Sequence, residues 1–285
     1  MNTALQTHPE ADALPDEDDA ADTATEPRGL GGKLAGLSLR RQVFVLAVWP
    51  FFQQVLNWLV SAVDTAVAGR LSVEATNAIG VTGYIGWLMG LLSMAVGAGA
   101  AALIARAVGG RHRGLANAGL GQALVIALVW GTFIGVGLYA GAQGICRAAG
   151  LTGESLGLAV LYLRILAVSS PLAALLFVGS MSLSAAGDTR SPFWVMLAVN
   201  VVNIGATLGL VSGGYGVAGI AAGTTAAYTL GGLIIVGVLL RPGGPIRLRS
   251  HRLRPHAQTI RRILRVATPN LGDRLGHWLG NFGVL

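Results

Sequence analysis

Four polar side chains in the first long apolar stretch of the sequence have the spacing of one helix face. Gln53, Asn57, Ser61 and Asp64 follow one another at intervals of four, four and three residues, so an α-helix would carry them on the same side. The set ends in a carboxylate, inside a segment that otherwise suits lipid or a protein interior. Because an ionisable side chain at membrane depth is costly to bury, it usually marks a functional site. Asp64 is therefore the first candidate for chemistry.

Two kinds of chemistry suit such a carboxyl group. Burial without a partner favours the protonated acid, so Asp64 would take up and release H+. Hard oxygen ligands around it would instead favour a cation, and Na+ is the one metal ion that we expect here. Either ion would link the occupancy of Asp64 to the conformation of its helix. The structural alternative is a hydrogen-bonded carboxylate near the outer end of the helix, four residues before Ala68.

The composition places these residues in a membrane protein. Only 12% of the residues are charged, against about a quarter in a soluble domain, and the mean hydropathy is +0.63. Most of the acids lie in the first 26 residues, and eight arginines lie at 241–265. Neither stretch carries the interleaved aromatic side chains that stack on bases, so we expect no nucleic acid partner. The partner that the composition predicts is the lipid bilayer.

Six apolar runs are long enough to cross a bilayer, which takes about 20 helical residues. They predict an all-α polytopic membrane protein, because a membrane-spanning backbone must satisfy its own hydrogen bonds. We expect a disordered acidic cytoplasmic tail at 1–40, an N-terminal six-helix transmembrane bundle at 41–240 and a basic cytoplasmic connector at 241–262. A truncated seventh helix at 263–285 would begin a second bundle. The six runs are 43–68, 78–105, 116–141, 156–185, 192–211 and 217–240.

The arginines predict how the chain is oriented. If the N-terminus is cytoplasmic, nearly all of the basic residues near the helix ends fall on the cytoplasmic side, and only Arg70 and Arg147 lie near the opposite loops. This is the distribution that the positive-inside rule describes. We therefore expect a multi-pass protein of the plasma (inner) membrane with a cytoplasmic N-terminus.

Glycine is abundant, with 42 residues, and in a membrane protein this indicates close packing of helices. Four pairs have the spacing that puts two small residues on one helix face. Some of these pairs are expected by chance alone. The pairs are Gly131/Gly135, Gly137/Gly141, Gly205/Gly209 and Gly219/Gly223.

The first and seventh apolar runs share a pattern. Pro50 opens one and Pro269 opens the other, Gln54 and Asp273 each follow four residues later, and a leucine follows each at six. Coming after a long basic connector, this echo predicts that a second six-helix repeat starts near residue 263. Internal repeats of this kind are common in transporters, whose sites lie near the midplane of the membrane.

Six short motifs follow one another in order over residues 43–285. They begin at Val63-Asp64-Thr65, Gly97-Ala98-Gly99, Tyr162-Leu163-Arg164, Gly187-Asp188-Thr189, Asn200-Val201-Val202-Asn203 and Gly216-Val217-Ala218-Gly219. This ordered set resembles the MATE (multidrug and toxic compound extrusion) family of efflux transporters. The first motif resembles the end of that family's first helix, and the second is similar to its signature leaving the second helix. The other four are similar to its fourth helix, the next loop, and its fifth and sixth helices.

The resemblance implies two six-helix bundles around a central cavity. It implies a secondary active antiporter that exports small organic cations or other lipophilic compounds in exchange for H+ or Na+, with no other cofactor. This chain would supply the N-terminal half, and a missing second bundle is the expected partner.

The resemblance also implies roles for individual residues. Asn203 matches the fifth-helix asparagine beside the coupling acid Asp64, and Thr225 matches a sixth-helix threonine at the same site. Thr207 stands where some archaeal members have a second aspartate, so Asp64 would be the main ion-coupling acid of this bundle. Two further groups complete the candidates: Gln53, Asn57 and Asn200 for the substrate cavity, and Asp273 and His277 for a proton pathway in the second bundle.

Other functions remain open at this point. A lipid-linked precursor flippase of the same superfamily would favour several cavity-lining arginines, whereas the spans offer only Arg164, which snorkels to the interface or pairs with Glu154. A membrane scaffold or truncated product that does not transport is the alternative from another class. We expect no enzyme, because the glycine-rich stretches lack the Gly-Lys-Ser/Thr of a phosphate loop and no zinc motif is present.

Overall fold

The computed structural model describes residues 39–249 and 256–282 of the 285-residue chain. All regular structure in these ranges is helical, which confirms the predicted fold class. The tail expected at 1–40 lies almost entirely outside the described residues, so its disorder stays a prediction. The helices are α3 (Leu39–Leu71), α4 (Val73–Gly109), α5 (Arg113–Ala148), α6 (Gly153–Ala185), α7 (Arg190–Ser212), α8 (Gly216–Leu240) and α9 (Ala257–Phe282).

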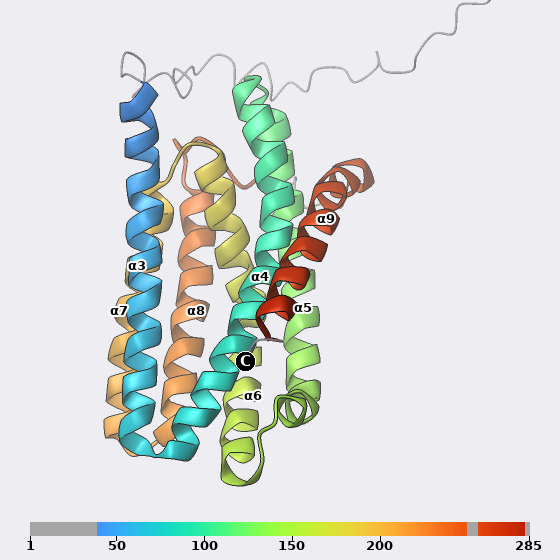
Figure 1. Ribbon diagram of the computed structural model, residues 1–285. Helices are drawn as coiled ribbons and strands as arrows, with labels where there is room; N and C mark the ends of the chain where they lie inside the picture. The colour runs from blue at the N-terminus through green and yellow to red at the C-terminus, as the bar shows by residue number, and fades with distance from the viewer. Residues whose placement is uncertain (1–38, 250–255, 283–285) are drawn as a thin grey trace, which may run out of the picture.

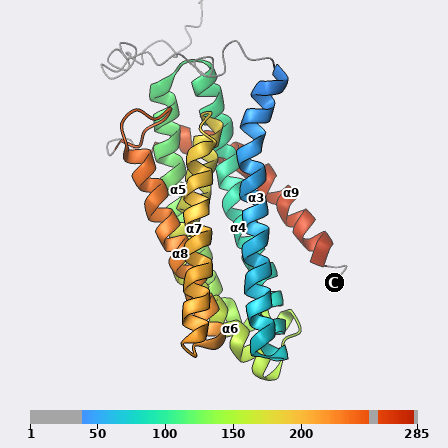
Figure 2. The same cartoon turned by 90° about the vertical axis from the view of Figure 1, so that its left-hand side faces the viewer.

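Helices α3 to α8 run alternately up and down, each antiparallel to the helix before it in the chain, and α9 crosses the bundle obliquely (Figures 1 and 2). Five of them, α4 to α8, are long and apolar enough to cross a membrane within the described part of the chain. The span predicted over α3 is not among these five. Five side chains of α3, at positions 39, 42, 43, 45 and 46, lie outside the described residues, so the membrane span there stays a prediction.

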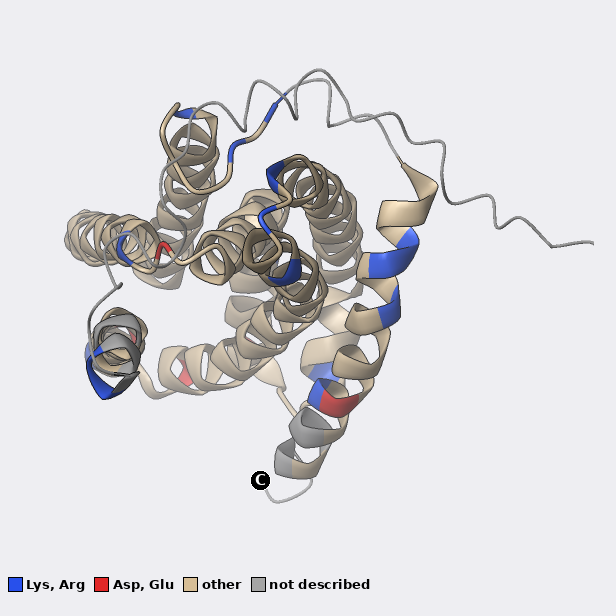
Figure 3. Cartoon of the chain, turned by 90° about the horizontal axis from the view of Figure 1, so that it is seen from above, with Lys and Arg blue, Asp and Glu red and all other residues tan. Residues whose placement is uncertain are grey.

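Short links with defined caps set the ends of the helices. Ser72 is the only residue between α3 and α4, and its Oγ accepts a hydrogen bond of 3.0 Å from the Ala75 N–H. Asp188 accepts hydrogen bonds from the N–H groups of Arg190 and Ser191 at the start of α7. Viewed from the end where α3 begins, Lys and Arg gather at the helix ends and on α9 (Figure 3).

Two of the four glycine pairs form close helix contacts. A Cβ on Gly131 or Gly135 would lie 2.7 Å from backbone oxygens of α6, and Gly219 and Gly223 are similarly close to α7. Gly137, Gly205 and Gly209 have no neighbouring atoms within 4 Å of a built Cβ, and Gly141 faces only Ile145 of its own helix. The other two pairs are therefore not packing motifs.

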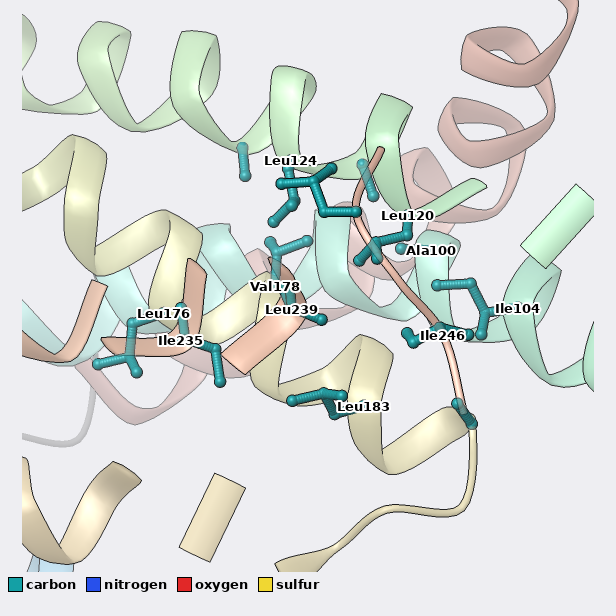
Figure 4. Close-up of a cluster of buried hydrophobic side chains, with 14 of the residues drawn as sticks. Ala100, Ile104, Leu120, Leu124, Leu176, Val178, Leu183, Ile235, Leu239 and Ile246 are labelled. Atoms are coloured by element: carbon teal, nitrogen blue, oxygen red, sulfur yellow. The ribbon is translucent and has the colours of Figure 1, made fainter. Parts of the chain in front are cut away.

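A cluster of buried aliphatic side chains joins α4, α5, α6 and α8 in the half of the bundle nearest the connector (Figure 4). Ile104, Leu120 and Leu183 are fully or almost fully buried in it. Ile246 of the connector is inserted into the same cluster. This core fixes α5, α6 and α8 relative to α4, and it leaves α3 to pack on the side of the bundle against α7 and α4.

The connector is shorter than predicted, because α9 begins at Ala257 and not near residue 263. The connector is tied down at Asn117, whose Oδ1 accepts a hydrogen bond of 2.8 Å from the Arg247 N–H. Residues 257–262, which were predicted to belong to the connector, form the first turns of α9 and share its amphipathic pattern. Ile263 and Ala267 are buried where α9 packs on α4 and α5, whereas Arg261, Arg262 and Arg265 are exposed.

Candidate functional site

Asp64 lies half-buried on the side of α3 that faces the bundle. Gln53, Asn57 and Val60 are also half-buried, and their spacing places them on the same helix face as Asp64. Ser61 is exposed, so the polar face predicted from the sequence holds for three of its four members. The opposite side of α3 is apolar and exposed, with Trp58 71% exposed.

A stripe of buried polar side chains runs along α7, the helix that packs against α3. Asn200, Asn203 and Thr207 are 6%, 4% and 0% exposed. Intervals of three and four residues place all three on one face. Hydrogen bonding continues from this stripe to α8, because Asn203 Nδ2 donates a 3.0 Å hydrogen bond to Thr224 Oγ1.

The Asp64 carboxyl group brings these elements together. Thr207 lies beside it, and the aromatic hydroxyls of Tyr162 on α6 and Tyr228 on α8 are close enough to interact with its charge. The Tyr162 hydroxyl in turn lies beside Thr224. Four helices, α3, α6, α7 and α8, therefore contribute to one polar site inside an apolar bundle.

Several polar atoms at this site lack a hydrogen-bond partner among the described residues. They include Asp64 Oδ1, Asn203 Oδ1 and Thr207 Oγ1, so the neighbouring Thr207 hydroxyl does not satisfy that carboxyl oxygen. Leaving a buried polar atom unsatisfied costs about 1–3 kcal/mol, and such groups are rare in structures. Three oxygens of this kind on facing helices are suited to receive a proton or a small hard cation.

Gly223 allows α7 and α8 to approach closely at the site. A Cβ at this position would lie 2.6 Å from Thr207 Oγ1 and 2.8 Å from the Thr207 backbone nitrogen. Only glycine fits without displacing one of the two helices. The next residue, Thr224, is thereby held against Asn203.

Thr225 does not lie beside Asn203. Its hydroxyl donates a 3.1 Å hydrogen bond to the Ile165 carbonyl of α6, and the site threonine of α8 is its neighbour, Thr224. Neighbouring helical residues differ in direction by about 100°, so a shift of one residue turns the side chain away from the site.

Three site residues were not selected from the sequence: Thr224, Tyr162 and Tyr228. Tyr162 belongs to a motif that the resemblance already included, and Tyr228 follows Thr224 by four residues on the same face of α8. A search for polar side chains at helical spacing from Asn203 and Asp64 in neighbouring spans would have indicated them.

The second-bundle candidates lie on α9. Asp273 is exposed there, and the side chain of His277 lies outside the described residues. No group of three or more His, Cys, Asp or Glu side chains that could hold a metal ion occurs in the described part of the chain. The polar atoms around Asp64 are instead amide and hydroxyl oxygens beside a single carboxylate.

A bundle of membrane-spanning helices with a carboxyl group in an internal polar site is an arrangement typical of helical membrane transporters. Residues 50–208, more than half of the chain, match the MatE family. The chain belongs to this family, whose members are transporters and not enzymes. The resemblance found in the sequence motifs is confirmed.

Curated relatives and solved structures agree with this assignment. The chain is 26% identical over 236 residues to the "Probable multidrug resistance protein NorM" of Thermotoga maritima, covering 81% of this chain and 51% of that protein. It is 26% identical over 175 residues to the "FAD transporter" of Shewanella oneidensis, covering 61% and 37%. A MOP superfamily transporter of Pyrococcus furiosus has the same fold, with a TM-score of 0.78, 22% identity, and coverage of 88% of this chain and 56% of that one. The matched part of the chain spans between about a third and about half of the length of these proteins.

Proposed function

We propose that the chain forms the first bundle of a secondary active antiporter, which exports cationic or lipophilic compounds in exchange for H+ or Na+. Asp64 is its main ion-coupling acid, and Asn203 and Thr207 complete the ion site. The observation that carries the proposal is the set of buried, unpartnered oxygens on Asp64, Asn203 and Thr207. Similarity to a protein described as a multidrug resistance protein supports the export of such compounds.

Coupling follows from the place of Asp64 on α3. An ion at the site would join the Asp64 carboxylate on α3 to the amide and hydroxyl oxygens of α7, so occupancy would favour close packing of these two helices. Without an ion, a charged Asp64 would favour an arrangement that admits water. An ion can shift such an equilibrium only by binding the two arrangements with different affinity. In this proposal the affinities differ because separating α3 from α7 would remove oxygens of α7 from the site.

The substrate cavity lies, in this proposal, next to the ion site. Gln53 and Asn57 continue the half-buried face of α3, and Asn200 continues the stripe of α7. Thr224 replaces Thr225 as the α8 threonine of the ion site, because its hydroxyl accepts from Asn203. A flippase for pyrophosphate-linked lipids is disfavoured, since Arg164 is exposed on α6 and does not face the site.

The complete transporter requires a facing bundle. We propose that a second bundle follows α9, that Asp273 and His277 belong to its proton pathway, and that the N-terminus lies on the cytoplasmic side of the plasma (inner) membrane. Arg106, Arg111 and Arg190 lie at helix ends on the side where α3 begins, which supports this orientation.

The test is efflux of ethidium from an efflux-deficient bacterial host that expresses the chain together with its second bundle. Asp64→Asn is expected to abolish the efflux, and Glu154→Gln, which changes an exposed acid in the first turn of α6, is the matched control. Undiminished efflux with Asp64→Asn at equal protein levels would refute the role of Asp64. In inverted vesicles, an imposed pH gradient or Na+ gradient then identifies the coupling ion.

A further inference from the structure

An apolar groove runs along the outer surface of the bundle between α5 and α6. It has a volume of about 300 Å³, and its lining includes Gly135, Val136, Tyr139, Ala167, Val168 and Pro171. Its walls include exposed side chains, since Val136 is 64% and Val168 is 70% exposed. In a membrane-spanning bundle this surface faces lipid, so acyl chains are the groups available to fill the groove.

The shape of the groove follows from the close contact of the two helices. A Cβ on Gly135 would lie 2.7 Å from the carbonyl oxygen of Ala167. Pro171 has no N–H, so this oxygen lacks the partner that a regular α-helix would provide four residues later. Glycine on α5 and proline on α6 therefore make a narrow channel with large side chains on both rims.

A positive charge stands at one end of the groove. The Arg164 guanidinium lies over the ring of Tyr139, with its central carbon 5.5 Å from the ring centroid. Arg164 precedes the groove residue Val168 by one helical turn and is exposed. Among the described residues no carboxylate pairs with it. Glu154, the partner considered from the sequence, lies ten residues earlier on α6, about 15 Å away along the helix axis.

The depth of Arg164 makes this charge unusual. It lies about three turns, or roughly 16 Å, from the start of α6, a helix of about 50 Å. With the hydrocarbon core of about 30 Å centred on this helix, the Arg164 backbone lies roughly 6 Å inside it. An arginine that faces lipid at this depth must draw an anionic group towards itself or bend towards the interface.

We propose that the α5–α6 groove and Arg164 together bind an anionic phospholipid. One acyl chain fills the groove between Val136 and Val168, and the lipid phosphate pairs with the Arg164 guanidinium, which is held in place by Tyr139. The planar guanidinium suits this role because it can donate two parallel hydrogen bonds to phosphate oxygens. This inference does not depend on the proposed transport cycle, because the groove lies on the outside of the bundle.

Native mass spectrometry of the purified chain with added phosphatidylglycerol or phosphatidylcholine tests the proposal. The unaltered chain is expected to retain phosphatidylglycerol over phosphatidylcholine. Arg164→Gln should lower retention of phosphatidylglycerol about fivefold and leave phosphatidylcholine unchanged. Arg147→Gln, which removes another exposed arginine at the end of α5, is the matched control and should keep the preference.

A second variant tests the groove itself. Val168→Trp fills the channel from an exposed position and should reduce the retention of both lipids without loss of helicity. The proposal is overturned if Arg164→Gln keeps the preference for phosphatidylglycerol, or if Val168→Trp binds both lipids as the unaltered chain does. An equal loss of both lipids with Arg164→Gln would also overturn it, because the headgroup would then not be recognised.

Discussion

Asn203 on α7 donates a 3.0 Å hydrogen bond from its side-chain amide to the hydroxyl of Thr224 on α8. The Thr224 hydroxyl donates to the Ile220 carbonyl of its own helix at 3.1 Å, so one hydrogen bond that it accepts and one that it donates fix its position. This leaves the amide oxygen of Asn203 without a partner among the described residues. The hydrogen bond from Asn203 to Thr224 therefore orients the Asn203 amide and leaves its oxygen available as an acceptor in the polar site that contains Asp64.

Loss of the Thr224 hydroxyl should weaken ion coupling. Thr224→Val keeps the volume but removes the acceptor for Asn203, and the loss of stability should be about 1 kcal/mol or less, as for other interhelical hydrogen bonds in membranes. Thr225→Val is the matched control, because it removes a hydroxyl that bonds to Ile165 on α6. Ion-driven ethidium transport should fall in the first variant only. Equal losses in both would contradict the assignment of Thr224.

Removal of the Thr207 hydroxyl should separate stability from coupling. Its oxygen is fully buried and has no hydrogen-bond partner within the described ranges, so Thr207→Val should leave the thermal unfolding temperature unchanged or raise it. The same change should weaken the stabilisation of the protein by the coupling ion. Thr82→Val, which alters a buried hydroxyl bonded to the Ala78 carbonyl of α4, should leave the ion response intact. A destabilised Thr207→Val with a normal ion response would show that Thr207 is structural.

Gly223→Ala should force α7 and α8 apart. The new Cβ would meet both the hydroxyl and the backbone nitrogen of Thr207, and overpacking of this kind costs about 1–3 kcal/mol. Gly237→Ala on the same helix has no atom within 4 Å of its Cβ and should not destabilise the fold. Thermal unfolding of the purified chain measures both. If Gly223→Ala is as stable as Gly237→Ala, the close approach at Thr207 does not constrain the site.

Asp188→Ala should lower stability without affecting ion coupling. Asp188 accepts two backbone N–H groups and the Ser191 hydroxyl at the start of α7, and loss of such a cap costs about 1 kcal/mol. Asp188→Asn should recover most of this stability. A change in the ion dependence of transport would mean that this acid belongs to the coupling pathway.

Helical spacing predicted the polar residues on α3 because it depends only on the period of the helix, whereas those on α7 came from the family resemblance. Asp64, Asn57 and Gln53 lie together on one face, as do Asn200, Asn203 and Thr207. The rotation of α8 could not be derived in this way, since its residues 221–227 are nearly all small. The contact at Gly223 sets that rotation, and it selects Thr224 in place of Thr225.

The start of α9 was also mispredicted, for a different reason. The prediction followed the apolar run, which begins near Ile263, but α9 is amphipathic and its first turns carry Arg261 and Arg262 on the exposed side. Apolar runs locate helices that are surrounded by lipid or core. They do not locate the polar ends of a helix that packs on one face only.

The most direct test of the account is the ion dependence of transport by the Asp64→Asn variant, measured in proteoliposomes that contain the chain with its second bundle. Ethidium movement is followed with and without an imposed gradient of H+ or Na+. The account predicts that a gradient of the coupling ion accelerates ethidium movement by the unaltered protein and has no effect with Asp64→Asn. Equal acceleration of both proteins would contradict the central role of Asp64.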